Sequence, residues 1–225
     1  QDWPWWQRWP LHATRPSQWD TWTGDVQVDL PWVDVQQLKQ HVQLPIEVMG
    51  GQGVLKAVGR WQRGVPQSVT LEGQLRDVAV KLGRELEPLA FRQWQGELTW
   101  LHQAQNSTLG FKGLAFELDD GAKWPASTGQ LTWQHERWPH ALDESIWRLT
   151  RSGEARTDRL DLAVLAAIAD RLPIAPGIRE ALARLSPQGQ VHDASWRWTG
   201  LPDDPKSYQA AGRVVGLSLA PDEAE

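Results

Sequence analysis

The chain has 225 residues, of which 40% are hydrophobic and 23% charged, a balance typical of a folded protein rather than a disordered one. Its formal net charge is −5 and no basic stripe is present, which argues against binding to nucleic acid or to an anionic membrane surface. The absence of cysteine excludes disulfides, thiolate metal sites and cysteine nucleophiles. No run of 18 apolar residues occurs, so no span of a bilayer is expected. Without an initiator Met or a leader, the sequence is expected to be a segment of a longer protein.

Tryptophan dominates the aromatic residues: there are 16 Trp, three Phe and one Tyr. Several of the Trp residues lie near the start, and residues 1–23 form a Trp-rich lead-in that the sequence pattern does not place in the fold. A large amphipathic ring packs well in cores and at sheet edges. A row of rings can also stack on a ligand. The sequence leaves both interpretations open.

Residues 24–200 read as one mainly β segment in which apolar residues alternate with polar ones. A short helical insertion is predicted at about 34–43 and a longer one at 162–185, where an Ala-rich run is followed by a second amphipathic turn. Residues 201–225 are predicted to form a further strand and a polar tail. Gly-polar-aliphatic triplets recur along the chain and are interpreted as strand starts. Turn signals at Arg63-Gly64, Asn106-Ser107 and Asp119-Asp120-Gly121 separate the strands, so a long antiparallel meander is predicted.

The alternation changes parity at three places, which predicts three β-bulges or turns. Side chains alternate strictly between the two faces of a strand, so one extra residue must be accommodated at each change, and a bulge bends the strand there. The predicted bulge residues are Asp77, Gly113 and Asp193. Residues 73–82 and 189–198 also match position by position, which indicates repeated strand units stacked in a line.

A catalytic or metal site is not expected. His135, Glu136 and His140 flank a Trp-Pro turn but lack a fourth ligand for zinc. The sequence around Asp119-Asp120-Gly121 lacks the remaining ligands of a calcium loop, and the glycine-rich residues 49–53 lack the Lys-Ser/Thr of a phosphate loop. Two carboxylates facing each other across a cleft, as in a glycosidase, are an alternative interpretation of the scattered Asp and Glu residues. The chain is therefore expected not to be an enzyme and not to bind a cofactor or a metal.

Two stretches carry a resemblance to a known family. The first is residues 110–125 followed by Gln130-Leu-Thr-Trp133; the second is residues 159–165, then Leu172-Pro173, then residues 185–196. Residues 51–61 and 75–78 fit the same pattern. Together, and in this order, they resemble YhdP-like members of the AsmA-like/TamB group of envelope proteins.

The resemblance implies a periplasmic segment from a Gram-negative bacterium, the full-length protein being anchored in the inner membrane. It implies an elongated, curved antiparallel sheet of groove-forming repeats with an apolar inner surface that carries phospholipid between the inner and outer membranes and supports the outer-membrane permeability barrier. The expected partners are phospholipid acyl chains, adjoining segments of the same long chain and other envelope proteins. The alternating apolar positions are candidate groove walls: Val69, Leu71, Leu75, Leu98, Trp100, Leu131 and Trp133.

Two other functions remain open. The first is a Trp-rich glycan-binding β module, which requires exposed rings in a row. The second is a structural scaffold segment whose sheet edges pair with neighbours. A lipid groove differs from both, since it mixes aliphatic residues with rings on one protected surface.

Overall fold

The computed structural model describes residues 22–39, 47–63, 65–82, 86–135, 150–172, 174, 176–201 and 204–220. Within these ranges most residues are in strands. The strands are β1 (Gly24–Asp34), β2 (Glu47–Val48), β3 (Gln52–Gln62), β4 (Val65–Lys81), β5 (Leu89–Gln103), β6 (Asn106–Leu118), β7 (Lys123–His135), β8 (Thr150–Asp161), β9 (Gln188–Leu201) and β10 (Asp204–Ser218). The helices are α1 (Val35–Lys39), α2 (Leu162–Ile168) with a 3₁₀ turn at Ala169–Arg171, and α3 (Pro176–Leu185).

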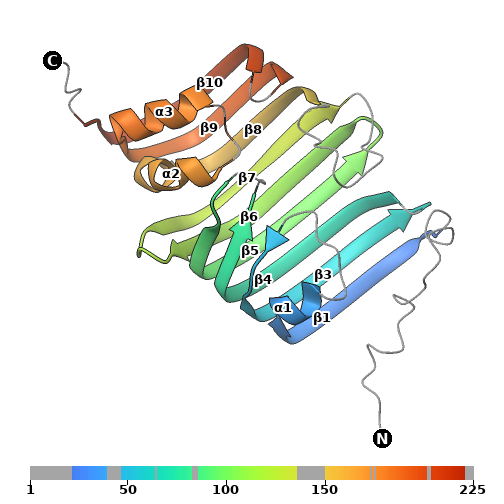
Figure 1. Cartoon of the computed structure of the whole chain (residues 1–225). Helices are drawn as coiled ribbons and strands as arrows, with labels where there is room; N and C mark the ends of the chain where they lie inside the picture. Colours follow the sequence, from blue (N-terminus) through green and yellow to red (C-terminus); the bar gives the residue numbers. More distant parts are fainter. Residues whose placement is uncertain are drawn as a thin grey trace, which may run out of the picture.

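The ten described strands form one open antiparallel sheet in which, with the exception of β2, strands that follow one another in the chain lie side by side (Figure 1). The order is β1-β3-β4-β5-β6-β7-β8-β9-β10, with the short β2 added beside β4. The predicted antiparallel meander is therefore confirmed. The helices lie in the two stretches where insertions were predicted, although residues 40–43 of the first insertion and the end of the polar tail lie outside the described residues.

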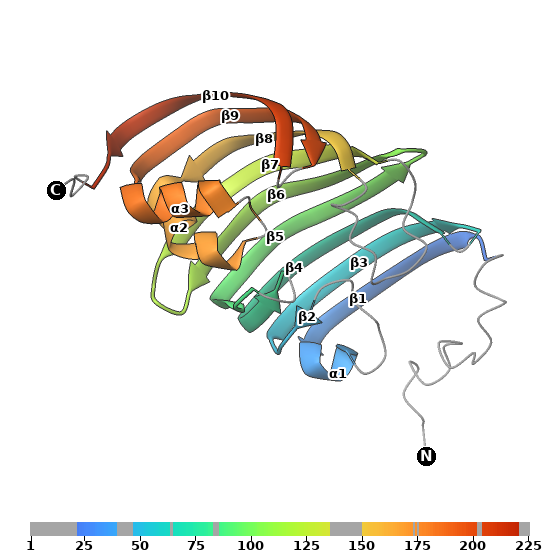
Figure 2. The same ribbon diagram turned by 45° about the horizontal axis from the view of Figure 1, so that its top comes forward.

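The sheet is bent rather than flat, and Figure 2 shows β8 to β10 arched on the side of α2 and α3. All three predicted bulge residues have positive φ: +54° at Asp77, +60° at Gly113 and +50° at Asp193. The pairing register shifts across Gly113 between β6 and β7 and across Asp193 between β9 and β10. The register of β4 with β5 is unbroken at Asp77. At the same level β5 has an irregularity of its own, between Phe91 and Gln93 in its pairing with β6, so that β4 and β5 depart from regular alternation together and stay in register.

One face of the sheet is apolar at one end and covered by helices. Val78, Phe91 and Leu118 lie side by side on β4, β5 and β6, and Val164 and Ile168 of α2 pack on them in one buried cluster. The N-terminus of α2 is capped by Asp161, whose Oδ1 accepts a hydrogen bond from the Val164 backbone N–H at 3.1 Å. Satisfying this otherwise unpaired N–H holds the start of α2 at the end of β8.

The recurring glycine triplets do not mark strand starts in general, which corrects that interpretation. Gly24 does begin β1, but Gly73, Gly129 and Gly153 lie in the middle of strands. A Cβ at Gly129 would lie 2.5 Å from Cζ of Phe111, and one at Gly153 would overlap the indole ring of Trp198. These glycines therefore leave room for aromatic rings that reach across from the next strand.

The turn at Asp119-Asp120-Gly121 joins β6 to β7, as predicted. The backbone N–H of Gly121 donates to the Leu118 carbonyl at 3.0 Å, and Oδ1 of Asp120 accepts from the Ala122 N–H at 2.9 Å. The β5–β6 turn lies earlier than predicted, between Gln103 and Asn106, which pair with each other. The predicted turn residue Ser107 is instead in β6 and only 1% exposed.

Candidate functional site

The seven candidate groove residues all lie on one face of the sheet. Residues that pair directly across antiparallel strands point to the same side. Val69 on β4 pairs with Trp100 on β5, which pairs through Leu109 on β6 with Leu131 on β7. The other four candidates fall on the same side by the two-residue period of the strands: Leu71, Leu75, Leu98 and Trp133. This side, which also carries the helices, is the apolar face.

The apolar face continues beyond the predicted residues to both edges of the sheet. The row that contains Leu131 runs on through Ala155 on β8 and Trp196 on β9 to Ala210 on β10. In the other direction it passes Gly59 on β3 to Val26 on β1. We call this the apolar row: Val26, Gly59, Val69, Trp100, Leu109, Leu131, Ala155, Trp196 and Ala210. Every side chain in it is uncharged and lacks a carboxylate, amide or hydroxyl group.

Sequence reasoning missed several members of this face. Phe111, beside the parity change at Gly113, and Trp196 and Trp198, beside the one at Asp193, are not among the predicted groove residues. Their alternation with polar residues was the signal that could have placed them. It did not do so because the two-residue period assigns a face within each strand but does not say which faces of different strands coincide.

Six of the seven candidate groove residues are half-buried, whereas Trp133 is 5% exposed. Beyond them, toward α2, the same face closes into the buried cluster of Val78, Phe91 and Leu118. Phe116 stacks on Trp124 there with ring centroids 5.5 Å apart, and Phe91 meets Phe116 edge to face. The face thus passes from a dry core at the helix end to a partly accessible apolar surface.

At the opposite end the apolar face contains a buried polar cluster. Oγ of Ser107 lies 3.2 Å from Nδ1 of His102 and 3.3 Å from Nε2 of His135. The two imidazoles stack with centroids 5.3 Å apart, and all three residues are at most 7% exposed. Burial, and secondarily the neighbouring His135, lowers the pKa of His102. A neutral His102 suits a hydrogen-bonding role rather than the binding of an anion.

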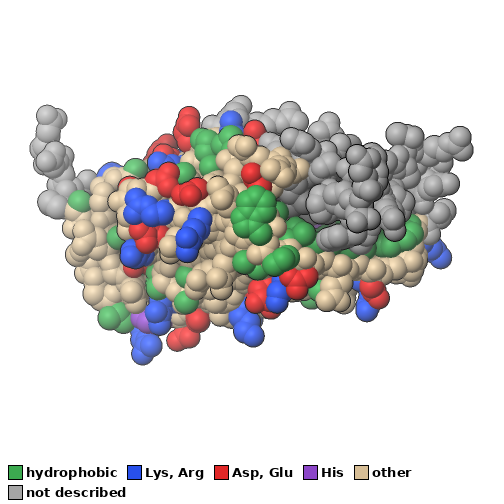
Figure 3. All heavy atoms as spheres, turned by 90° about the horizontal axis from the view of Figure 1, so that it is seen from below, with side chains coloured by type: hydrophobic (Ala, Val, Ile, Leu, Met, Phe, Trp, Pro, Cys, Tyr) green, Lys and Arg blue, Asp and Glu red, His purple; other side chains and the backbone are tan. Residues whose placement is uncertain are grey.

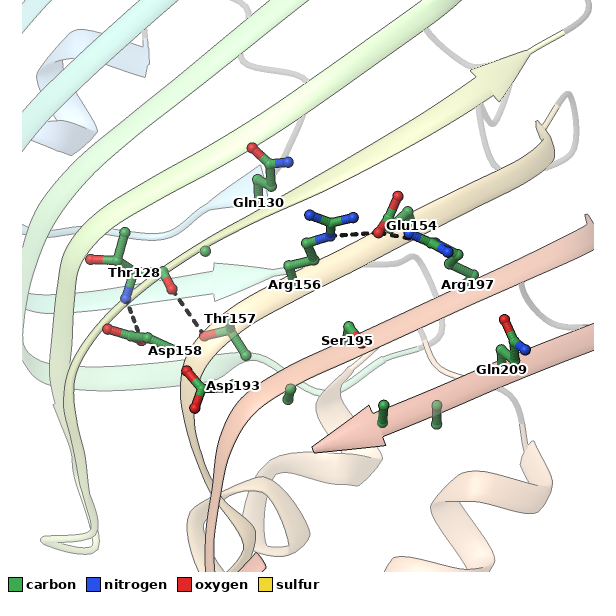
Figure 4. A pocket seen from close by; sticks show the side chains of 14 residues that line it. Thr128, Gln130, Glu154, Arg156, Thr157, Asp158, Asp193, Ser195, Arg197 and Gln209 are labelled. Atoms are coloured by element: carbon green, nitrogen blue, oxygen red, sulfur yellow. Dashed lines mark hydrogen bonds and ion pairs between the residues drawn. The ribbon is translucent and has the colours of Figure 1, made fainter. Parts of the chain in front are cut away.

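The opposite face of the sheet is polar. On β8 and β9 the Glu154 carboxylate pairs with Arg156 and with Arg197, the latter at 3.1 Å. The hydrogen bond from Arg156, with one from Arg197, holds the pKa of Glu154 below its ordinary value. Figure 4 shows these side chains beside Thr128, whose backbone N–H donates to Asp158 at 2.8 Å. Together with Gln130 and Gln209 they line a depression of about 840 Å³.

Charge on the surface is mixed in sign. In Figure 3, Lys and Arg side chains are interspersed with Asp and Glu over the part of this surface that the described residues form. Glu117 illustrates the pattern, because it accepts from Lys123 at 3.2 Å and from Arg92 at 2.8 Å. Such alternation produces no large field of one sign.

The aromatic rings bear on the choice between a lipid groove and a glycan platform. Trp94, Trp100, Trp124, Trp133, Trp196 and Trp198 all lie on the apolar face among aliphatic residues. Among the Trp residues that the structure describes, Trp32 stands out as exposed, at 62%. These six rings on the apolar face are therefore buried or half-buried in a mixed surface rather than set out in an exposed row.

The described part of the chain contains no group of three or more His, Cys, Asp or Glu residues that could hold a metal ion. Glu136 and His140 of the His135 motif lie outside the described residues. None of the described helices combines the length and the apolar character required to cross a membrane.

Comparison with known proteins adds one positive finding. No curated protein and no solved structure matches the chain. The family model described as YhdP protein matches residues 8–224, which is nearly the whole chain. The chain belongs to the YhdP family of cell-envelope proteins.

Proposed function

We propose that this segment is a non-catalytic lipid-binding surface of a bridge-like envelope protein, along which phospholipid acyl chains pass between the inner and outer membranes. The observation that carries the proposal is the apolar row, which crosses the sheet from β1 to β10 without a charged or amide side chain. In this proposal the segment lies in the periplasm and the full-length protein is anchored in the inner membrane. The protein supports the permeability barrier of the outer membrane.

The energetic reason for such a surface is the cost of exposing acyl chains to water. Each exposed CH₂ group costs about 0.8 kcal/mol, so one palmitoyl chain costs on the order of 12 kcal/mol. A half-buried apolar face that spans many strands removes much of this cost while the headgroup stays in water. The face needs no preformed cavity of fixed size, because acyl chains adapt to a mixed aliphatic and aromatic surface.

Native mass spectrometry of the gently purified chain tests the proposal. We expect co-purifying phospholipid, and we expect Leu131→Glu to reduce its occupancy severalfold, since a carboxylate in the apolar row is costly to bury beside hydrocarbon. Gln130→Glu is the matched control, because it adds the same charge at the adjacent, exposed position on the polar face of β7. Circular dichroism verifies that both variants fold.

Two outcomes would overturn the lipid proposal. One is an unmodified chain that carries no phospholipid and takes up none from vesicles, while it binds tightly on a glycan array. The other is equal lipid occupancy in the two charge variants, since the apolar face would then not be where the lipid lies.

A structural role is a second candidate, favoured by the β10 edge. β10 pairs only with β9 among the described strands, and it exposes Val214, Val215 and Leu217 by 48%, 52% and 56%. Unpaired strand edges with apolar side chains are usually covered. In this proposal an adjoining segment of the same long chain, or another envelope protein, pairs with β10 and extends the sheet, which is compatible with the lipid proposal. Reduced hydrogen exchange of the β10 amides when further chain is included would support it; unchanged exchange would contradict it.

A further inference from the structure

The apolar face changes chemical character over a single step along the strands. The row next to the apolar row, on the side away from α2, begins at His102 on β5 and Ser107 on β6, and ends at Trp198 on β9 and Tyr208 on β10. We call it the polar-aromatic row: His102, Ser107, Trp133, Gly153, Trp198 and Tyr208. Imidazole, hydroxyl, indole and phenol groups thus adjoin a surface of aliphatic side chains and rings.

This change of polarity matches the interfacial region of an amphiphile. Trp and Tyr rings favour positions where one end meets hydrocarbon and the other end finds hydrogen-bond partners. The helix-covered cluster of Val78, Phe91 and Leu118 lies at the other end of the same strands. An amphiphile on this face is therefore best accommodated with its tails toward α2 and its polar part at the polar-aromatic row.

Two indole N–H groups at this boundary have no acceptor. Within the part of the chain that the structure describes, no atom accepts from Nε1 of Trp196 or Nε1 of Trp198, and both nitrogens are buried. Trp198 is 8% exposed, and the two rings meet edge to face with centroids 6.4 Å apart. Burying a donor without an acceptor is costly. A ligand that supplied an acceptor to these N–H groups would therefore gain more binding free energy than it would at a donor that already has a partner.

The boundary favours a neutral acceptor over an anionic one. No Lys or Arg belongs to the polar-aromatic row, whereas phosphate recognition in proteins relies on such cations. Tyr208, directly opposite Trp198, is 71% exposed and places its phenol hydroxyl at the margin of the sheet. The carbonyl oxygens of fatty-acyl esters are neutral acceptors that lie between the tails and the headgroup of a glycerolipid.

We propose that the indole N–H groups of Trp196 and Trp198 donate to the ester carbonyls of a diacyl glycerolipid whose acyl chains lie on the apolar row. This inference rests on the proposed function and deepens it, since it assigns the lipid an orientation and an ester-reading site. In the present structure both nitrogens are covered by protein, so the carbonyls would replace the neighbours that now cover them.

Indole NMR of the ¹⁵N-Trp-labelled chain tests this proposal. Trp196→Phe and Trp198→Phe assign the two resonances and remove each N–H while keeping an aromatic ring. The probes are dihexanoyl phosphatidylcholine below its critical micelle concentration and its diether analogue, which has the same tails and headgroup but no ester carbonyls. The Trp124 indole is an internal reference, because its N–H already donates to Ser127 Oγ at 2.8 Å.

With the diester lipid we expect the Trp196 and Trp198 indole protons to move downfield while that of Trp124 stays in place. We expect the diester to bind about tenfold more tightly than the diether, as two added hydrogen bonds would give. Trp198→Phe should reduce the ratio of the diester affinity to the diether affinity, while the diether still binds. Equal binding of the two lipids to the unmodified chain, or unmoved indole protons at saturation, would overturn the ester-reading site and leave the lipid surface standing. Binding of neither lipid would overturn both proposals.

Discussion

The indole ring of Trp198 lies against the backbone of Gly153, its direct partner across β8 and β9. A Cβ at position 153 would overlap the indole ring. Gly153→Ala is therefore expected to lower the free energy of unfolding by about 1–3 kcal/mol, as overpacking does, and urea denaturation measures the change. Gly177→Ala in α3 is the control, since no atom lies within 4 Å of the added methyl group, and it should leave stability unchanged or slightly higher. Equal effects of the two substitutions would contradict this packing role.

The backbone at Asp193 should tolerate glycine and reject a β-branched residue. Its φ of +50° lies in the left-handed region, where Asp is tolerated and Val is strained. Asp193→Val is expected to cost about 1–3 kcal/mol of unfolding free energy, whereas Asp193→Gly should cost little. Ser195→Val, two residues along β9, is the matched control and should change stability by less than about 0.5 kcal/mol. The prediction fails if Val is tolerated equally at positions 193 and 195.

The Asp161 carboxylate should contribute to the stability of α2. Because its Oδ1 accepts from the Val164 N–H at 3.1 Å, Asp161→Ala should lower the unfolding free energy by about 1 kcal/mol. Asp161→Asn retains the acceptor and should behave almost as the unmodified chain does in thermal unfolding. If Asn and Ala destabilised the chain equally, the cap would not be the source of the effect.

His102 should make the fold sensitive to mild acid. Its pKa in the folded chain is lowered from the ordinary 6.5, first by burial and then by His135. As the pH falls, His102 is therefore protonated in the unfolded chain before it is protonated in the folded chain. The free energy of unfolding keeps its full value above about pH 6.5 and decreases as the pH falls below that value. His102→Gln should weaken the loss of unfolding free energy between about pH 7.5 and pH 5.5. Urea titrations across this range measure it, and parallel pH profiles for the two proteins would contradict it.

The sequence alone determined the strands and their faces, because side-chain alternation is a local property with a period of two residues. Val69, Leu71 and Leu75 identify one face of β4 without reference to any other strand. The parity changes likewise marked Asp77, Gly113 and Asp193, all of which have positive φ. The same local alternation grouped the candidate groove residues within β4, within β5 and within β7, whereas strand pairing brought these three groups to one face.

Tertiary structure alone decided which residues stand beside one another across strands. The pairing register depends on turn lengths and on the bulges between strands, so it placed Gly153 opposite Trp198 and showed that mid-strand glycines leave room for rings. It brought Ser107 between His102 and His135, although the sequence pattern predicts a turn at Ser107. It also placed the apolar row beside the polar-aromatic row. This boundary arises only when separate strands pair in register, because each row is made of residues that lie far apart in the chain.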